Sequence, residues 1–292
     1  MKKTLLILVA AVILVSCGSK TKKQTDDTPT VITVSILPEK TFVEKIAGND
    51  FEINVLIPPG SSPAAYTLLP SQMKDIAQSA IWFRIGYIGF EHSWKDKIAQ
   101  ANTKMKVVNI SEGLDLIAEE EEELHGDHAH LEGVDPHTWL SPRLVKQMAK
   151  TILNEISTMK PERAEIYRSN YDKFMEECDA LDTEIRTKLE PYKGRKIIVF
   201  HPSLSYYARE YGLEQHSLES GGKEPTPAHM KSVVDIANKE NIQVIYIQGE
   251  FDREHARVFA NEIKGEIVEV WPLNPEWEAN LRKMTDIFIS HF

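Results

Sequence analysis

Residues 31–57 read VITVSILPEKTFVEKIAGNDFEINVLI, in which two β-rich runs, VITVSI and EINVLI, flank a segment that is compatible with a helix. Strands that alternate with helices indicate units of parallel sheet. The alternation continues in two further β-rich runs, IWFRI at 81–85 and KVVNI at 106–110. These four runs predict an N-terminal α/β lobe, to which we assign residues 31–142.

The second half of the chain repeats this alternation of strand-like and helix-like segments. Its β-rich runs are KIIVF at 196–200, LEQHSL at 213–218, VIYIQ at 244–248 and EIVEV at 266–270. They predict a C-terminal α/β lobe over residues 194–292. The expected fold class is therefore α/β, with two parallel-sheet lobes.

Residues 143–193, which connect the lobes, are expected to form linking helices. Pro161 suits the first turn of a helix, and Pro191 stands near its other end. An apolar stripe spaced by four and three residues runs between them: Tyr167, Tyr171, Phe174, Cys178, Leu181, Ile185 and Leu189. Such a stripe suits either a coiled-coil dimer or an internal spine buried against both lobes. The two flanking lobes favour the spine, a long rigid helix.

The chain begins MKKTLLILVAAVILVSCGSK, which has two lysines, an apolar run and then small residues that end in Cys17. This pattern predicts a signal peptide over residues 1–16, because the apolar run is too short for a stable membrane span. The end of the run resembles a bacterial lipobox, which implies cleavage before Cys17 and a lipid on its sulfur. An ordinary cleaved signal is the alternative. The polar residues 17–30 cannot bury apolar surface, so we expect a disordered tether.

The chain is acidic, with 34 lysines and arginines against 44 aspartates and glutamates and a net charge of −10. Loss of Lys2 and Lys3 with the signal would leave −12. An acidic surface repels phosphate backbones, which argues against nucleic acid as a partner, and it concentrates cations. Because lipidation would consume Cys17, Cys178 has no partner for an internal disulfide. We expect Cys178 to be a small buried hydrophobic residue.

Two histidines occupy positions that suit a ligand cleft. His201 directly follows KIIVF, and the carboxyl ends of parallel strands line the ligand crevice in open α/β sheets. His137 lies in VDPHTWLSP between two prolines, which indicates a fixed loop. Imidazoles that face each other from two lobes would favour a borderline metal such as Zn²⁺. A metal cleft between the lobes is therefore geometrically possible.

Residues 119–133 read EEEEELHGDHAHLEG and bring five consecutive glutamates together with three histidines: His125, His128 and His130. The run of glutamates alone would be typical of a solvated loop. Imidazole and carboxylate side chains that are clustered in this way can also bind a divalent ion weakly. We favour an accessory loop that collects metal over an inert one.

Motifs that would identify an enzyme are missing from the sequence. The chain contains no His-Glu-x-x-His, no Gly-x-Ser-x-Gly, no Gly-x-x-x-x-Gly-Lys and no Gly-x-Gly-x-x-Gly. The sequence thus offers no specific reason to propose catalysis, and we expect a protein that is not an enzyme.

The stretches PPGSSPAAYTLLPSQMKDI, DPHTWLSP, HPSLSYYAREYGL, GKEPTPAHM and EVWPLNPEWEANL match one family in order and in spacing. The sequence resembles the periplasmic zinc/manganese solute-binding proteins of ABC importers. The resemblance implies two α/β lobes on a long rigid helix with the metal between them. It also implies a monomeric receptor of the cell envelope that serves a membrane permease and its ATPase.

The resemblance implies that His137 is the second metal ligand of the family pattern and that His201 is the third. The first and fourth ligands would fall on Ala64 and Trp271, whose side chains cannot bind a metal. The missing ligands could come from Gln248 or Glu250, in the stretch IQGEFD, of which Glu250 is the better candidate. The three histidines of the accessory loop could supply them instead. His92 and His216 are interpreted as structural.

Three functions remain open at this point. A lipid-anchored receptor that captures Zn²⁺ for an ABC importer is favoured, with Mn²⁺ as the less favoured ion because the site has few carboxylates. A receptor of the same fold could instead take a chelated metal or a small organic ligand, in a pocket lined by Trp271, Tyr66 and Tyr206. A surface adhesin that transports nothing is the third possibility.

Overall fold

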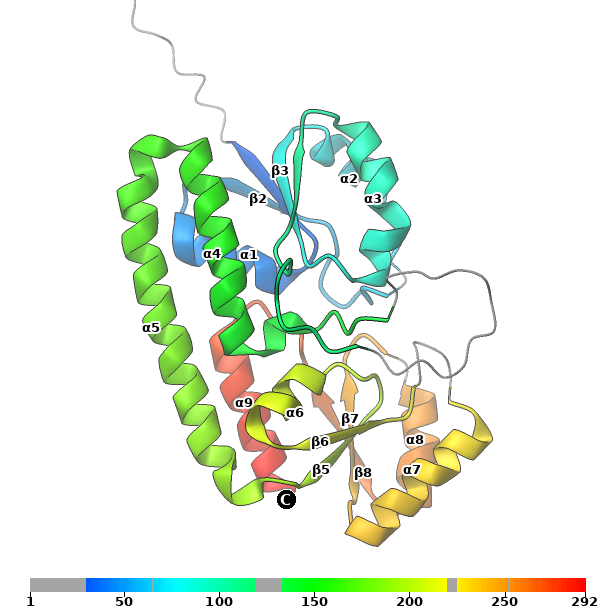
Figure 1. Ribbon diagram of the computed structural model, residues 1–292. Helices are drawn as coiled ribbons and strands as arrows, with labels where there is room; N and C mark the ends of the chain where they lie inside the picture. Colours follow the sequence, from blue (N-terminus) through cyan, green and yellow to red (C-terminus); the bar gives the residue numbers. More distant parts are fainter. Residues whose placement is uncertain (1–29, 65, 119–132, 220–224, 252) are drawn as a thin grey trace, which may run out of the picture.

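The computed structural model describes residues 30–64, 66–118, 133–219, 225–251 and 253–292. It shows two α/β lobes, one above the other in Figure 1, with two long helices along one side. The predicted signal peptide and Cys17 lie outside the described residues, as do His125, His128 and His130 and almost all of the tether and the accessory loop. None of the helices among the described residues is long and apolar enough to cross a membrane.

The N-terminal lobe is built on a parallel sheet in the order β2-β1-β3-β4. Its strands are β1 (Val31–Val34), β2 (Glu52–Val55), β3 (Ser79–Arg84) and β4 (Lys106–Asn109). Its helices are α1 (Leu37–Ala47), α2 (Pro70–Ile76) and α3 (Gly89–Ala101). The chain therefore passes from β2 across β1 to β3, which places a topological switch point between β1 and β3 at the centre of this sheet.

The C-terminal lobe repeats this topology with a parallel sheet in the order β6-β5-β7-β8. Its strands are β5 (Lys196–Val199), β6 (Glu214–Ser217), β7 (Val244–Gln248) and β8 (Glu266–Val270). Its helices are α6 (Ser205–Tyr211), α7 (Pro227–Glu240), α8 (Arg253–Glu262) and α9 (Trp277–Ser290). All eight predicted strands are present, which confirms the α/β prediction.

The lobes are joined by a short 3₁₀ turn and two long helices. These elements are η1 (Thr138–Leu140), α4 (Pro142–Met159), η2 (Pro161–Arg163), α5 (Ala164–Leu189) and η3 (Glu190–Tyr192). Ser141 caps α4, since its hydroxyl accepts a hydrogen bond from the Leu144 amide at 3.2 Å. Helix α5 has 26 residues without a break and runs along both lobes in Figure 1.

The apolar stripe of α5 is buried inside the chain, which confirms the internal spine. Every member is buried except Tyr171, which is half-buried. Burial raises the pKa of the Cys178 thiol to about 12. This thiol is therefore a packing group, as expected, and not a reactive one.

An aromatic cluster of Phe42, Phe174 and Trp277 shows how α5 holds the two lobes. These rings come from α1 of the N-terminal lobe, from α5, and from α9 of the C-terminal lobe. The ring of Phe174 lies 6.0 Å from that of Phe42 and 6.1 Å from that of Trp277, between centroids. The Phe42 and Trp277 rings meet edge to face at 5.3 Å. Both lobes thus pack against one helix through one continuous core.

Two buried carboxyl groups, those of Glu39 and Glu91, lie where β1 and β3 end. The Glu39 carboxylate accepts hydrogen bonds from the amides of Ser35 and Ile36 at 2.9 and 3.0 Å. The Glu91 carboxylate accepts one from the Ser35 hydroxyl at 2.5 Å. Burial raises the pKa of the Glu39 carboxyl well above its usual value, and the neighbouring charge of Glu91 raises it further. Burial likewise raises the pKa of Glu91.

The raised pKa of the Glu39 carboxyl leads us to predict that the stability of the protein falls as pH rises. Since the folded pKa of Glu39 exceeds its unfolded value, the stability from its protonated form is complete below about pH 4 and is lost as pH rises through the folded pKa. The Glu39→Gln variant keeps an acceptor for both amides and carries no charge. We expect it to raise the free energy of unfolding by at least about 1 kcal/mol near pH 8, because each unit by which the pKa is raised costs about 1.4 kcal/mol once the carboxyl is ionised.

Urea unfolding of both proteins near pH 8 and near pH 4.5 would measure this difference, which should shrink at the lower pH. Glu44→Gln is the matched control, because Glu44 lies on the same helix with an exposed side chain. A Glu39→Gln protein that is less stable than the wild type near pH 8 would contradict the assignment.

Candidate metal site between the lobes

His137 lies immediately before η1 and is held by Asp135. The Asp135 carboxylate accepts a hydrogen bond from the His137 amide at 2.8 Å, and the same oxygen lies 2.7 Å from His137 Nδ1. Burial by itself would raise the pKa of the Asp135 carboxyl, but the His137 ring and its hydrogen bonds outweigh burial and lower it. Asp135 is therefore an ionised acceptor that fixes the orientation of the imidazole.

His201 lies two residues beyond the end of β5, where the Phe200 amide still donates to the Tyr246 carbonyl at 2.7 Å. Its Nδ1 is 2.7 Å from the Glu219 carboxylate. Its ring stacks on Phe251 with centroids 5.0 Å apart and planes 22° apart. The position at the carboxyl end of a strand agrees with the prediction, and a carboxylate orients this imidazole as well.

The two imidazoles meet across the boundary between the lobes. Their ring centroids are 5.2 Å apart with planes at 70°, and the side chains of His137 and His201 are 12% and 17% exposed. With each Nδ1 donating its proton to a carboxylate, each Nε2 carries the lone pair that a metal requires. Histidine ligands in metalloproteins commonly have this carboxylate support. The structure therefore brings together the two histidines that the sequence singled out.

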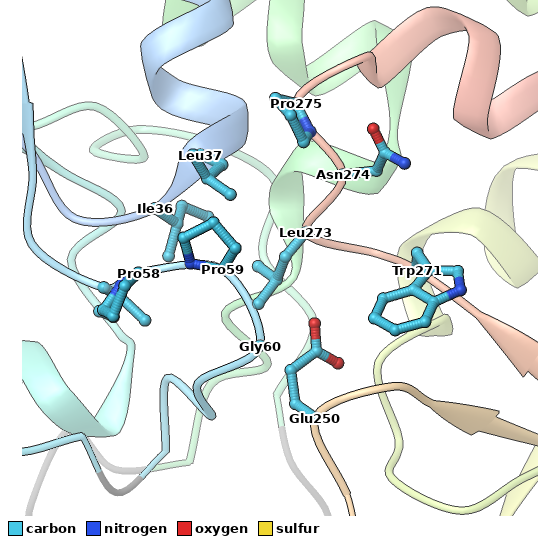
Figure 2. Close-up of a pocket in the computed structure, with 11 residues that line it drawn as sticks. Ile36, Leu37, Pro58, Pro59, Gly60, Glu250, Trp271, Leu273, Asn274 and Pro275 are labelled. Atoms are coloured by element: carbon cyan, nitrogen blue, oxygen red, sulfur yellow. The ribbon is translucent and has the colours of Figure 1, made fainter.

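A cavity of about 130 Å³ lies between the lobes (Figure 2). It is lined by segments that follow four strands: Ile36 and Leu37 after β1, Ile57 to Gly60 after β2, Glu250 after β7, and Trp271 with Leu273 to Pro275 after β8. The carboxyl ends of the two sheets thus face each other across the cavity, as expected for a ligand crevice. Its walls are mainly apolar, Glu250 is the charged residue among those that line it, and neither His137 nor His201 lines it.

Gln248 and Glu250, the two candidates from β7, have different surroundings. Gln248 is buried and donates to the His201 carbonyl at 2.8 Å, so it supports the segment that carries His201. Glu250 reaches into the cavity in Figure 2. Burial raises the pKa of its carboxyl, and His201 partly opposes this rise. Within the described part of the chain, no three His, Cys, Asp or Glu side chains converge closely enough to hold an ion as they stand.

The two positions where the family pattern expects further ligands hold other structures. Ala64 is exposed in a turn that packs on the start of α3, where the Phe90 amide donates to the Pro63 carbonyl at 3.0 Å. The Trp271 indole lies against Gly249, where an added Cβ would be 2.0 Å from the ring. Only glycine at position 249 leaves room for this indole.

The expectation that Tyr66 and Tyr206 line the pocket beside Trp271 is wrong. Trp271 does line the cavity, but the Tyr66 hydroxyl donates to Gln72 at 3.0 Å and its ring packs on Phe90. Tyr206 is fully buried in contacts with Ile117 and Asp135. Both tyrosines make their contacts outside the cavity, and neither lines it.

The remaining histidines of the prediction lie on regular elements away from the pair. His92 is on α3 and His216 is in β6, the edge strand. Burial lowers the pKa of His216, and the nearby charge of Lys196 lowers it further. Sequence reasoning missed Asp135 and Glu219, the two carboxylates that orient the site, although Asp135 stands only two residues before His137.

Known proteins share the sequence pattern and the fold of this chain. The family model described as "Zinc-uptake complex component A periplasmic" matches residues 32–288. This chain belongs to the ZnuA family. A solved structure titled "Crystal structure of ZnuA" superposes with a TM-score of 0.83 at 33% identity, over 90% of this chain and 99% of that one.

Two relatives of this ZnuA-family chain are named for different ions. The "Zinc-binding lipoprotein AdcA" of Streptococcus pneumoniae is 29% identical over 286 residues, which are 94% of this chain and 55% of AdcA. The chain therefore spans about half of AdcA. The "Manganese-binding lipoprotein MntA" of Halalkalibacterium halodurans is 24% identical over 272 residues, 89% of this chain and 86% of MntA.

Membership of the ZnuA family confirms the expected class of protein. Its members are periplasmic receptors that deliver a metal to an ABC importer, and they are not enzymes. A membrane permease and an ATPase are the partners that such a receptor requires. The protein accordingly belongs to the cell envelope.

Proposed function

We propose that this chain is a lipid-anchored receptor that captures Zn²⁺ and holds it through Nε2 of His137 and of His201. The observation that carries the proposal is the pair of facing imidazoles, each oriented by a buried carboxylate. Neutral imidazole is a preferred ligand of Zn²⁺. The metal is the cargo of the receptor and does not remain with it as a cofactor.

Glu250 is our candidate for a third ligand. It follows β7, and His201 follows β5, which is the neighbour of β7 in the sheet. Both side chains therefore leave the same edge of the C-terminal lobe. Burial raises the pKa of the Glu250 carboxyl, and a bound cation would favour loss of its proton. The charge of His201 acts on the Glu250 carboxyl, which supports Glu250 as a neighbour of the imidazole pair.

Zn²⁺ is favoured over Mn²⁺ because two of the proposed ligands are imidazoles. A manganese site would normally hold more carboxylates, and among the described residues that line the cavity Glu250 is the one carboxylate. AdcA and MntA differ in the ion for which they are named, so the family does not choose between the ions. The preference for Zn²⁺ rests on the types of ligand alone.

The envelope anchor is also part of the proposal. We assign residues 1–16 to a removed signal peptide, Cys17 to lipidation, and residues 17–30 to a tether that leads into β1. The lobes would comprise residues 31–142 and 194–292, around linking helices at 143–193. We expect a monomer in which His125, His128 and His130 of the 119–133 loop collect metal.

Titration of chelator-stripped protein with Zn²⁺ and with Mn²⁺ tests this function. We expect one equivalent of Zn²⁺ to bind, and to bind more tightly than Mn²⁺. The Glu250→Gln variant should weaken zinc affinity by at least about tenfold, the least effect typical of groups around a metal. Isothermal titration with a competing chelator gives both affinities.

Glu262→Gln is the matched control, because this exposed residue removes the same charge at the far end of α8. Unchanged affinity in Glu250→Gln would remove Glu250 from the site. Protein that binds neither ion would overturn the receptor function in favour of an organic ligand in the apolar cavity.

A further inference from the structure

Tyr206 forms a polar contact between the two lobes. It lies on α6 of the C-terminal lobe and is fully buried. Its hydroxyl donates to the Asp135 carbonyl at 2.8 Å and accepts from the Ile117 amide at 3.1 Å. Both partners belong to the N-terminal lobe. The phenol oxygen is thus paired in both directions, as a buried hydroxyl should be.

The two partners of Tyr206 are also paired with each other. The Asp135 amide donates to the Ile117 carbonyl at 3.0 Å, and Ala118 forms an antiparallel bridge with Val134. Residues 117–118 and 134–135 therefore form a short two-stranded stem. The Tyr206 hydroxyl closes one end of this stem with bonds to both of its strands.

Helix α6 holds the same region through a second residue. Arg209 donates to the Asp115 carbonyl at 3.1 Å, and its guanidinium lies over the Tyr206 ring at 5.1 Å. Helix α6 thereby also fixes the backbone just before the stem.

The two ligand segments meet through this contact. The Asp135 side chain orients His137, while its carbonyl is held by Tyr206, five residues beyond His201 in HPSLSYY. We propose that Tyr206 is a positioning residue of the metal site, which fixes the Asp135 backbone and so sets the His137 imidazole relative to His201. This inference rests on the proposed function, because it takes both imidazoles as ligands.

The Tyr206→Phe variant tests the proposal, because it removes one oxygen and leaves the ring in place. It leaves the Ile117 amide and the Asp135 carbonyl without their partner, so the Asp135 carboxylate is free to shift. We expect zinc affinity to fall about tenfold, the lower end of the range for groups that support metal ligands. We also expect the visible absorption of the Co²⁺-loaded protein to change, because this spectrum reports ligand geometry.

Tyr207→Phe is the matched control. Tyr207 is the next residue of α6, it is equally buried, and its hydroxyl lies 2.7 Å from that of Thr285 in the C-terminal lobe. Its loss should lower the melting temperature but leave zinc affinity and the Co²⁺ spectrum unchanged.

Each outcome decides between the proposals. If Tyr206→Phe binds zinc like the wild type, or if Tyr207→Phe weakens binding to the same extent, Tyr206 has no positioning role. If His137→Ala leaves zinc affinity unchanged, the proposed function is wrong, and the present inference falls with it. If His137→Ala weakens binding and Tyr206→Phe does not, only the present inference fails.

Discussion

Replacing His137 and His201 together by alanine should weaken zinc binding by more than about 100-fold, beyond the range for groups that only support metal ligands. The two imidazoles supply both proposed nitrogen ligands, and the described residues contain no group of three or more His, Cys, Asp or Glu side chains that could hold the ion in their place. The side chains of His137 and His201 are mostly buried, but they lie at the boundary between the lobes and not in the hydrophobic core. The variant should therefore fold.

The affinity is measured by titration against a competing chelator, with circular dichroism as the test of folding. His291→Ala is the matched control. His291 lines a pocket with Lys196, the first residue of β5, so it lies at the opposite end of this strand from His201. The control should bind zinc normally. A double variant that retains the affinity of the wild type would show that the metal binds elsewhere.

Truncating Phe174 to alanine is expected to lower the free energy of unfolding by about 3–5 kcal/mol, the usual cost of removing a buried aromatic ring. The Phe174 ring packs against both Phe42 and Trp277, so its loss opens a cavity where both lobes meet α5. These two rings come from α1 and α9, one from each lobe, so closing the cavity requires the two helices to move.

Urea unfolding followed by circular dichroism measures this loss. Ile166→Ala is the comparison, because Ile166 lies on the same helix and is 44% exposed. Its effect should stay within about 0.5 kcal/mol, as for other surface substitutions. Equal effects of the two truncations would mean that α5 is not the shared core of the lobes.

The fold was largely predictable because its signals are local. Buried parallel strands appear as short apolar runs, and every residue of VIYIQ in β7 is buried. The stripe on α5 has helical spacing over its full length. His137 and His201 could be predicted for the same reason, since a loop fixed by prolines and a strand end both restrict where a side chain lies.

The partners of the site depend on contacts between distant segments, which one sequence does not display. Glu219 reaches His201 only because β6 pairs with β5. The orientation of Tyr206 is set by the stem at residues 117 and 135, and an isolated seven-residue helix does not specify it. Glu39 would be taken for a surface charge in a helix, yet it is fully buried.

The indole that lies against Gly249 gives the molecule an optical property. Of the five tryptophans, Trp82, Trp139 and Trp277 are at most 2% exposed, whereas Trp271 is 38% exposed and borders the cavity. The emission of a tryptophan depends on the polarity around its ring. Trp271 is thus a natural fluorophore at the mouth of the cleft, and its spectrum senses what enters between the lobes without any added label.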